Sequence, residues 1–330
     1  MKTVLVTGCA GFIGWMVSKR LLERGYVVLG IDNMNDYYDP RLKEWRLKDL
    51  SGSESFRFFK LDIAEHETLK SFLEPERVVT ISGGLPEAVI NLAARAGVRA
   101  SIENPWNYLD TNVRGTLNLL EYCRATGIKK FILASTSSIY GLNEMPFRES
   151  DFADRPLAPY SATKKAAEAI CYTYHFLYGI DITIPRYFTV YGPAGRPDMS
   201  IFRFIRDIDT GKPIPVFGDG RQKRDFTYID DIAEGTLRCL EPFGYEIFNL
   251  GSDNPAELLQ VIRFIEETLD KKAVFQWLPR HPADVPATWA DIEKSKKLLN
   301  WAPTVEIEEG IKRTIRWYRE HRDFVMTLKD

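Results

Sequence analysis

Short apolar runs alternate with longer stretches of helical periodicity through the first half of the chain. The apolar runs are expected to be strands, and they lie at residues 3–8, 26–32, 57–63, 88–94 and 129–136. Stretches such as 14–25 and 112–127 instead repeat apolar residues every three or four positions, which is typical of amphipathic helices. Strand–helix alternation with apolar strands predicts a parallel sheet that is covered on both faces.

The sequence pattern changes after about residue 190, where Pro and Gly become frequent and the regular alternation of strands and helices stops. The runs 181–188 and 246–251 are expected to return as late strands of the first sheet. The sequence therefore predicts an α/β, doubly wound (Rossmann) domain over residues 1–189, with a late strand returning near 236–251. Residues 190–330 are predicted to form a smaller C-terminal lobe that binds substrate.

Composition and charge change this picture little. The chain has 330 residues and a net charge of −2, so no general attraction to nucleic acid or to anionic membranes is expected. Its apolar runs are too short to span a bilayer, and the N-terminal strand leaves no room for a leader. The cysteines lie far apart, as buried, reduced thiols of a cytoplasmic protein would, and the histidines show no metal-ligand spacing.

A glycine-rich turn follows the first strand. In "TGCAGFIG", Gly8, Gly11 and Gly14 would let the backbone approach a pyrophosphate at the start of a helix. The alternative is a glycine-rich turn with no ligand. Asp32 ends the next strand. A carboxylate at this position can accept hydrogen bonds from both ribose hydroxyls and would repel a 2′-phosphate, so the pattern favours NAD over NADP.

Later strand ends would reach the same cofactor. Asp62 and Ile63 could meet the adenine. Small residues after the fourth strand would leave room for a dinucleotide, although, taken alone, they are better explained as a packed strand end; they are Leu92, Ala93 and Ala94.

Candidate reacting groups lie further along the chain. Tyr160 and Lys164 are four residues apart in a predicted helix, so they share one face, and a nearby positive charge would favour the phenolate of Tyr160. The alternative is that Tyr160 and Lys164 are only a surface pair on an amphipathic helix. A run of hydroxyls ends the preceding apolar strand and could either cap a turn or bind a substrate hydroxyl; it consists of Ser135, Thr136, Ser137 and Ser138.

Taken together, these motifs resemble the extended short-chain dehydrogenase/reductase superfamily, and most closely its UDP-glucuronate 4-epimerases. The resemblance spans nearly the whole chain. The segments that carry it are "TGCAGFIG", "DNMNDYYD", "NLAARAGVR", "STSSIYG", "YSATK", "RYFTVYGPAGRPDM", "GDGRQKRDFTYIDDIA" and "DVPATWADIEKSKKLLNW".

The resemblance implies an epimerase that uses NAD without net oxidation. Tyr160 would take the proton from the 4-hydroxyl of a UDP-sugar, Thr136 would hydrogen-bond that oxygen, and Lys164 would hold the nicotinamide ribose. The resulting 4-keto sugar would rotate about its diphosphate link and take the hydride back on its other face, which converts UDP-glucuronate to UDP-galacturonate. Further cofactor contacts implied are Phe12, Ile13, Asn33, Asn35, Asn112, Ser135, Tyr187 and Phe188.

Substrate contacts also follow from the resemblance. Phe217 would meet the uracil, and Arg224 a phosphate, unless it pairs with Asp225 or Asp230. Arg196 is a candidate reader of the sugar carboxylate, the alternative being a solvated side chain. The other implied contacts are Arg99, Ser137, Ser138, Thr189, Val216 and Asp284.

Several alternatives remain open. The hydroxyl run has no acid beside it, which favours epimerisation over the dehydration or decarboxylation of related enzymes. A UDP-glucose or UDP-N-acetylhexosamine 4-epimerase, or a non-catalytic NAD-binding protein, would share most motifs. Apolar stripes over 112–127 and 163–179 suggest a homodimer or simply cover the sheet. The chain departs from the family pattern at Trp15, Met16, His281 and Ala283, and the first two, on the predicted helix, are expected to affect packing more than chemistry.

Overall fold

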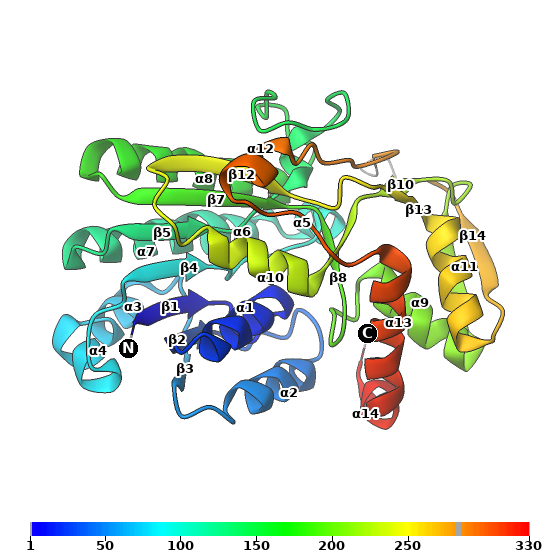
Figure 1. The fold of residues 1–330 in the computed structure, drawn as a ribbon, viewed down its shortest axis with the longest axis horizontal. Coiled ribbons are helices and arrows are strands. Elements are labelled where there is room, and N and C mark those ends of the chain that lie inside the picture. The colour runs from blue at the N-terminus through cyan, green and yellow to red at the C-terminus, as the bar shows by residue number, and fades with distance from the viewer. Residues whose placement is uncertain (1, 281–284, 330) are drawn as a thin grey trace.

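The computed structural model describes residues 2–280 and 285–329 (Figure 1). Its main sheet has the order β12-β7-β5-β4-β1-β2-β3, and every pairing along this path is parallel. A short strand, β6 (Ser135–Thr136), pairs with β7 at one end. This arrangement confirms the doubly wound α/β fold. The strands are β1 (Thr3–Thr7), β2 (Val27–Asp32), β3 (Phe56–Lys60), β4 (Ala88–Asn91), β5 (Lys130–Leu133), β7 (Asp181–Tyr187) and β12 (Tyr245–Leu250).

Helices cover both faces of this sheet because its central strands are apolar on both sides. Along β1, Val4 and Val6 belong to one buried cluster, and Leu5 belongs to the other. The first cluster lies under α1 (Phe12–Glu23) and α10 (Ile229–Arg238), which pack against each other (Figure 1). The second lies under α3 (His66–Phe72), α7 (Gly115–Thr126) and α8 (Pro159–Tyr178).

The remaining elements of the first half connect these layers. They are α2 (Pro40–Leu50), α4 (Pro75–Ser82), α5 (Val98–Glu103), α6 (Pro105–Tyr108), the π-helical segment Leu109–Arg114 and a short 3-10 turn, Ser137–Tyr140.

The C-terminal lobe stands beside the carboxyl ends of the sheet strands (Figure 1). Its strand pairs are β9 (Pro213–Phe217) with β14 (Val274–Leu278), β8 (Thr189–Tyr191) with β11 (Phe226–Tyr228), and β10 (Lys223–Arg224) with β13 (Ala256–Glu257). Its helices are α9 (Ser200–Thr210), α11 (Leu258–Leu269), α13 (Ile307–Glu320) and α14 (Arg322–Thr327), while α12 (Glu293–Leu298) packs on β12.

The chain leaves the main sheet where β7 ends at Tyr187 and β8 begins at Thr189. It returns through α10 and β12, so the expected late strand is present. One apolar cluster runs without a break from Val4 in the sheet to Ile311 in the lobe. The division at residue 189 stays a prediction.

Expectations about packing, cysteines and membrane-spanning segments can be compared with the fold. Trp15 is buried, its ring meets Trp45 edge-on at 5.8 Å, and its indole N–H donates to Asp49 at 2.8 Å, so this departure from the family pattern serves packing. The four cysteines are buried and free, as predicted. None of the described helices combines the length and the apolarity needed to cross a membrane.

Candidate active site

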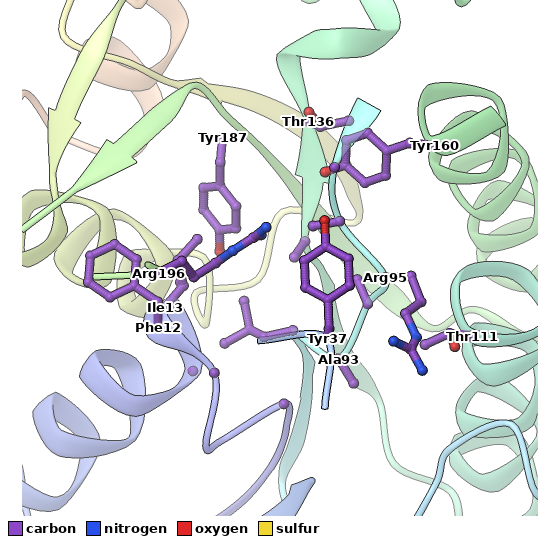
Figure 2. A pocket seen from close by; sticks show the side chains of 18 of the residues that line it. Phe12, Ile13, Tyr37, Ala93, Arg95, Thr111, Thr136, Tyr160, Tyr187 and Arg196 are labelled. Atoms are coloured by element: carbon purple, nitrogen blue, oxygen red, sulfur yellow. The ribbon is translucent and has the colours of Figure 1, made fainter. Parts of the chain in front are cut away.

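A cavity of about 410 Å³ opens at the carboxyl ends of the sheet strands, the usual place for a ligand in this fold (Figure 2). Most residues predicted from the sequence line it. From the cofactor set these are Gly8, Gly11, Phe12, Ile13, Gly14, Asp32, Asn33, Asn35, Asp62, Ile63, Leu92, Ala93, Ala94, Ser135, Tyr160, Lys164, Tyr187 and Phe188. From the catalytic and substrate sets they are Thr136, Ser137, Ser138, Thr189 and Arg196.

The glycine turn is built for close approach of backbone. Gly8 has a φ of +71°, and a Cβ there would lie 2.8 Å from the carbonyl oxygen of Leu92. A Cβ on Gly14 would lie only 2.0 Å from the carbonyl oxygen of Gly8. Helix α1 starts here without a side-chain cap, so its first N–H groups are available to an anion. These features fit the pyrophosphate of a dinucleotide.

The ends of β2 and β3 are joined by side chains that line the cavity. Asp32 Oδ1 accepts from the backbone N–H of Met34 at 2.8 Å and from the ammonium of Lys43 at 3.3 Å. Asn33 Nδ2 donates to Asp62 Oδ2 at 2.7 Å. The carboxylate of Asp32 is thus held at the strand end, where it suits ribose hydroxyls.

The reacting groups lie across the cavity from the glycine turn. Figure 2 shows the phenol of Tyr160 beside Thr136, and both residues line the cavity. Pro159 begins α8, which places Tyr160 in its first turn, and Lys164 follows one turn later. The ammonium of Lys164 donates to the carbonyl oxygen of Ala134 at 3.0 Å. The predicted hydroxyl, phenol and ammonium are therefore brought together.

The expected depression of the Tyr160 pKa is not produced by the chain alone. Burial raises the pKa of this phenol, although the hydrogen bond with Thr136 and the charge of Arg196 act in the opposite direction. Burial also lowers the pKa of Lys164 to about 8. The hydrogen bond from Thr136 and the charge of Arg196 therefore do not outweigh burial, and a further positive charge from a bound group would be needed to favour the phenolate.

Arg196 points into the cavity rather than into solvent. Its guanidinium lies 5.3 Å from the centre of the Tyr37 ring, and Figure 2 shows it facing the space in front of Tyr160. Its Nε and Nη2 donate to the two carboxylate oxygens of Asp198 at 3.0 and 2.5 Å. The solvated alternative for Arg196 therefore does not describe this structure.

Several predicted residues lie elsewhere. Arg99 and Phe217 are outside the cavity lining, and the guanidinium of Arg99 lies 4.1 Å from the centre of the Phe217 ring. Val216 is buried in the lobe, and Arg224 donates to the carbonyl oxygen of Lys223 at 2.8 Å.

Asn112 also sits behind the cavity wall. Its side chain bonds the backbone of Arg95 in both directions and donates to Thr163 at 3.1 Å. It therefore braces the wall beside α8. Asp284, His281 and Ala283 lie outside the described residues.

The cavity also contains residues that the sequence did not single out. Tyr37 and Tyr38 lie in the "DNMNDYYD" segment, and Asp198 lies in the loop that carries Arg196. Lys43 and Arg95 carried no sequence signal of their own. Within residues 2–280 and 285–329, no group of three or more His, Cys, Asp or Glu side chains is arranged to hold a metal ion.

Solved structures of two sugar-nucleotide epimerases are similar to this chain in fold. A Bacillus cereus UDP-glucuronic acid 4-epimerase, solved with UDP-glucuronic acid and NAD, has a TM-score of 0.87 and 36% identity, covering 96% of this chain and 99% of that one. A Thermotoga maritima UDP-glucose 4-epimerase, solved with UDP-glucose, has a TM-score of 0.86 and 32% identity, covering 97% and 99%.

Comparison of sequences gives the same grouping. A Thermodesulfobacterium geofontis protein named UDP-glucuronate 4-epimerase is 57% identical over 330 residues, which is 100% of both chains. Residues 4–251 match the NAD dependent epimerase/dehydratase family. With its glycine turn, its Tyr160–Lys164 helix and relatives of this similarity, the chain belongs to that family.

Proposed function

We propose that this chain is an NAD-dependent UDP-glucuronate 4-epimerase, which interconverts UDP-glucuronate and UDP-galacturonate through a transient 4-keto sugar. The observation that carries the proposal is the position of Arg196, whose guanidinium shares one cavity with Thr136 and Tyr160. A 57% identical relative bearing that name supports it.

Acid–base work falls to Tyr160 and Thr136. Tyr160 removes the proton from the sugar 4-hydroxyl and later returns it, while Thr136 hydrogen-bonds the same oxygen and keeps it aimed at the phenol. When bound, the nicotinamide of NAD supplies the redox chemistry and the positive charge that lowers the pKa of Tyr160. Lys164, whose ammonium donates to the carbonyl oxygen of Ala134 in this structure, is assigned to the nicotinamide ribose.

The other cofactor residues follow the cavity wall. We assign the pyrophosphate to the turn of Gly8, Gly11 and Gly14, and the adenosine ribose to Asp32. The remaining assigned cofactor residues are Phe12, Ile13, Asn33, Asn35, Asp62, Ile63, Leu92, Ala93, Ala94, Ser135, Tyr187 and Phe188, with Asn112 supporting from behind.

Arg196 is assigned to the substrate carboxylate. Asp198 takes the edge of the guanidinium formed by Nε and Nη2. The second edge, formed by Nη1 and Nη2, suits a second carboxylate in a bidentate pair. Ser137 and Ser138 line the same cavity and are assigned to the sugar.

We assign the UDP half of the substrate to the lobe over residues 190–330. Thr189, Val216, Phe217, Arg224 and Asp284 are its proposed contacts, with Arg99 beside them. Because Arg99 already covers one side of the Phe217 ring, uracil binding requires either that side to be cleared or the other side to be used.

The test is an NMR assay of the anomeric proton with UDP-glucuronate and, separately, UDP-glucose. We expect UDP-glucuronate to convert to UDP-galacturonate and UDP-glucose to react far more slowly. Arg196→Met should lose activity on UDP-glucuronate by at least tenfold, whereas Arg263→Met, an exposed arginine on α11, should not. Conversion of UDP-glucose alone would keep the epimerase mechanism and refute the role of Arg196. No conversion of either would point to the non-catalytic alternative.

We also propose that two copies pair through α7, α8 and the helical segments that contact them. Exposed apolar side chains lie on elements that contact one another, namely Trp106, Leu109, Leu117, Tyr172 and Phe176. Sedimentation velocity should give a dimer that Phe176→Glu dissociates and Phe152→Glu, on an exposed loop, does not.

Free, buried thiols at all four cysteines agree with a reducing, cytoplasmic location, which we also propose.

A further inference from the structure

A fully buried arginine stands between the two halves of the candidate site. Arg46, on α2, has no exposed surface. Its Nη1 donates to the carbonyl oxygen of Ala10 at 3.0 Å and to the hydroxyl of Tyr38 at 2.7 Å. Its Nε and Nη2 donate to the carbonyl oxygen of Ala194 at 3.2 and 2.7 Å.

These acceptors belong to different functional segments. Ala10 is part of the glycine turn assigned to the cofactor pyrophosphate. Ala194 and Gly195 directly precede Arg196, and the carbonyl oxygen of Gly195 lies 3.4 Å from the guanidinium of Arg46. One side chain therefore ties the loop that carries Arg196 to the loop that approaches the cofactor.

The loop that carries Arg196 contains a residue in a strained backbone conformation. Ala194 adopts a φ of +52°, a left-handed conformation that an L-residue other than glycine rarely takes. Strained backbone of this kind persists only where its surroundings hold it. The contacts from Arg46 to the Ala194 carbonyl are the hydrogen bonds that do so.

Charge makes the arrangement unusual. Among the described residues, the hydrogen-bond partners of Arg46 are all uncharged, since they are backbone carbonyls and a phenol. Its guanidinium also lies over the rings of Phe12 and Tyr38, at 5.9 and 5.5 Å. Burying a cation without a carboxylate partner costs free energy, so stability alone does not explain Arg46. Its role is to fix the positions of the segments that it joins.

A second path leads from Arg46 to Arg196 through two adjacent tyrosines. Tyr38 contacts Arg46, and its neighbour Tyr37 lies against the guanidinium of Arg196 at 5.3 Å. The two rings meet edge-on at 6.5 Å. Each tyrosine of the pair thus contacts one of the two arginines, and the loop that continues from Asp32 supports the sugar end of the site.

We propose that Arg46 is a positioning residue that sets the discrimination between carboxylated and neutral UDP-sugars by fixing Arg196 against the glycine turn. This inference rests on the proposed role of Arg196. Arg46 itself touches no substrate. A lysine in its place keeps the charge but cannot bond Ala10, Tyr38 and Ala194 together, since it lacks the planar fork.

The test measures binding rather than turnover. In a Tyr160→Phe background, which stops the reaction, calorimetry gives Kd values for UDP-glucuronate, UDP-glucose and UDP. We expect Arg46→Lys to lower the preference for UDP-glucuronate over UDP-glucose at least tenfold while the Kd of UDP changes less than threefold. Tyr38→Phe removes one acceptor and should lower the preference by a smaller factor. Lys48→Met, an exposed cation on the same helix, should leave it unchanged.

Three results separate the possible failures. If the parent protein binds both sugars equally, both the role of Arg196 and this inference are wrong. If the parent prefers UDP-glucuronate and both Arg46→Lys and Tyr38→Phe retain that preference with unchanged melting temperatures, only the inference is wrong. An equal loss for all three ligands would likewise refute it, because Arg46 would then support nucleotide binding in general.

Discussion

Removing one charge from the ion pair beneath the site should cost a large share of the stability of the protein. Glu168 and Arg186 are each about 1% exposed, and the guanidinium of Arg186 donates to both carboxylate oxygens of Glu168 at 3.0 and 2.8 Å. Ser135, which lines the cavity, donates to Glu168 at 2.6 Å. Glu168→Gln leaves Arg186 buried without its counter-charge, which costs about 3–5 kcal/mol.

For a chain of 330 residues, that loss corresponds to a fall in Tm of about 4–7 °C. Differential scanning fluorimetry and urea unfolding of Glu168→Gln, Arg186→Met and the double variant measure it. Because the double variant removes both charges, it should be more stable than the two single losses added together predict, by about 2 kcal/mol or more. Additive losses, or a single variant within 1 °C of the parent, would refute the reasoning.

Three further outcomes follow from the geometry of the cavity. Gly14→Ala should abolish NAD binding, measured by fluorescence titration, because its Cβ would lie 2.0 Å from the carbonyl oxygen of Gly8. Lys164→Met should stabilise the cofactor-free protein by at most about 3 kcal/mol at pH 7, because folding lowers the pKa of Lys164 from 10.5 to about 8 and the folded protein must therefore bury a charged ammonium below pH 8. That advantage should shrink as the pH rises from about 8 to 10.5, where the unfolded lysine also loses its proton; urea unfolding at several pH values tests it. Asp198→Asn should raise the preference for UDP-glucuronate over UDP-glucose about tenfold, because the charge of Arg196 loses its internal partner; competition binding measures it.

The parts of the molecule that the sequence predicted are those set by local pattern. Strand–helix alternation gave the sheet because each apolar strand must be buried on both faces. The glycine turn and the spacing of Tyr160 and Lys164 were recognisable because the backbone around each is regular, and both face the same cavity. These features depend on neighbours within a few residues of one another.

Contacts between distant segments could not be predicted in the same way. Arg46 meets Ala194 across 148 residues, and nothing in "RLKEWRLKDL" distinguishes it from the other cations of α2. Trp15 packs against Trp45, 30 residues further along the chain, and no local pattern identifies that partner. The guanidinium of Arg196 likewise lies against Tyr37, which belongs to a loop 159 residues earlier in the chain.

The carboxylate of Asp198 shows why charge alone cannot make Arg196 selective. A neutral sugar in the cavity leaves Arg196 paired with Asp198, so it suffers no penalty from an uncompensated cation. A carboxylated sugar must share one guanidinium with Asp198, and the two anions repel each other. The second carboxylate therefore gains only if it reaches the remaining edge of the guanidinium with good bidentate geometry. Selectivity then depends on where the guanidinium is held, and the segments that hold it are the tyrosine pair and the loop fixed by Arg46.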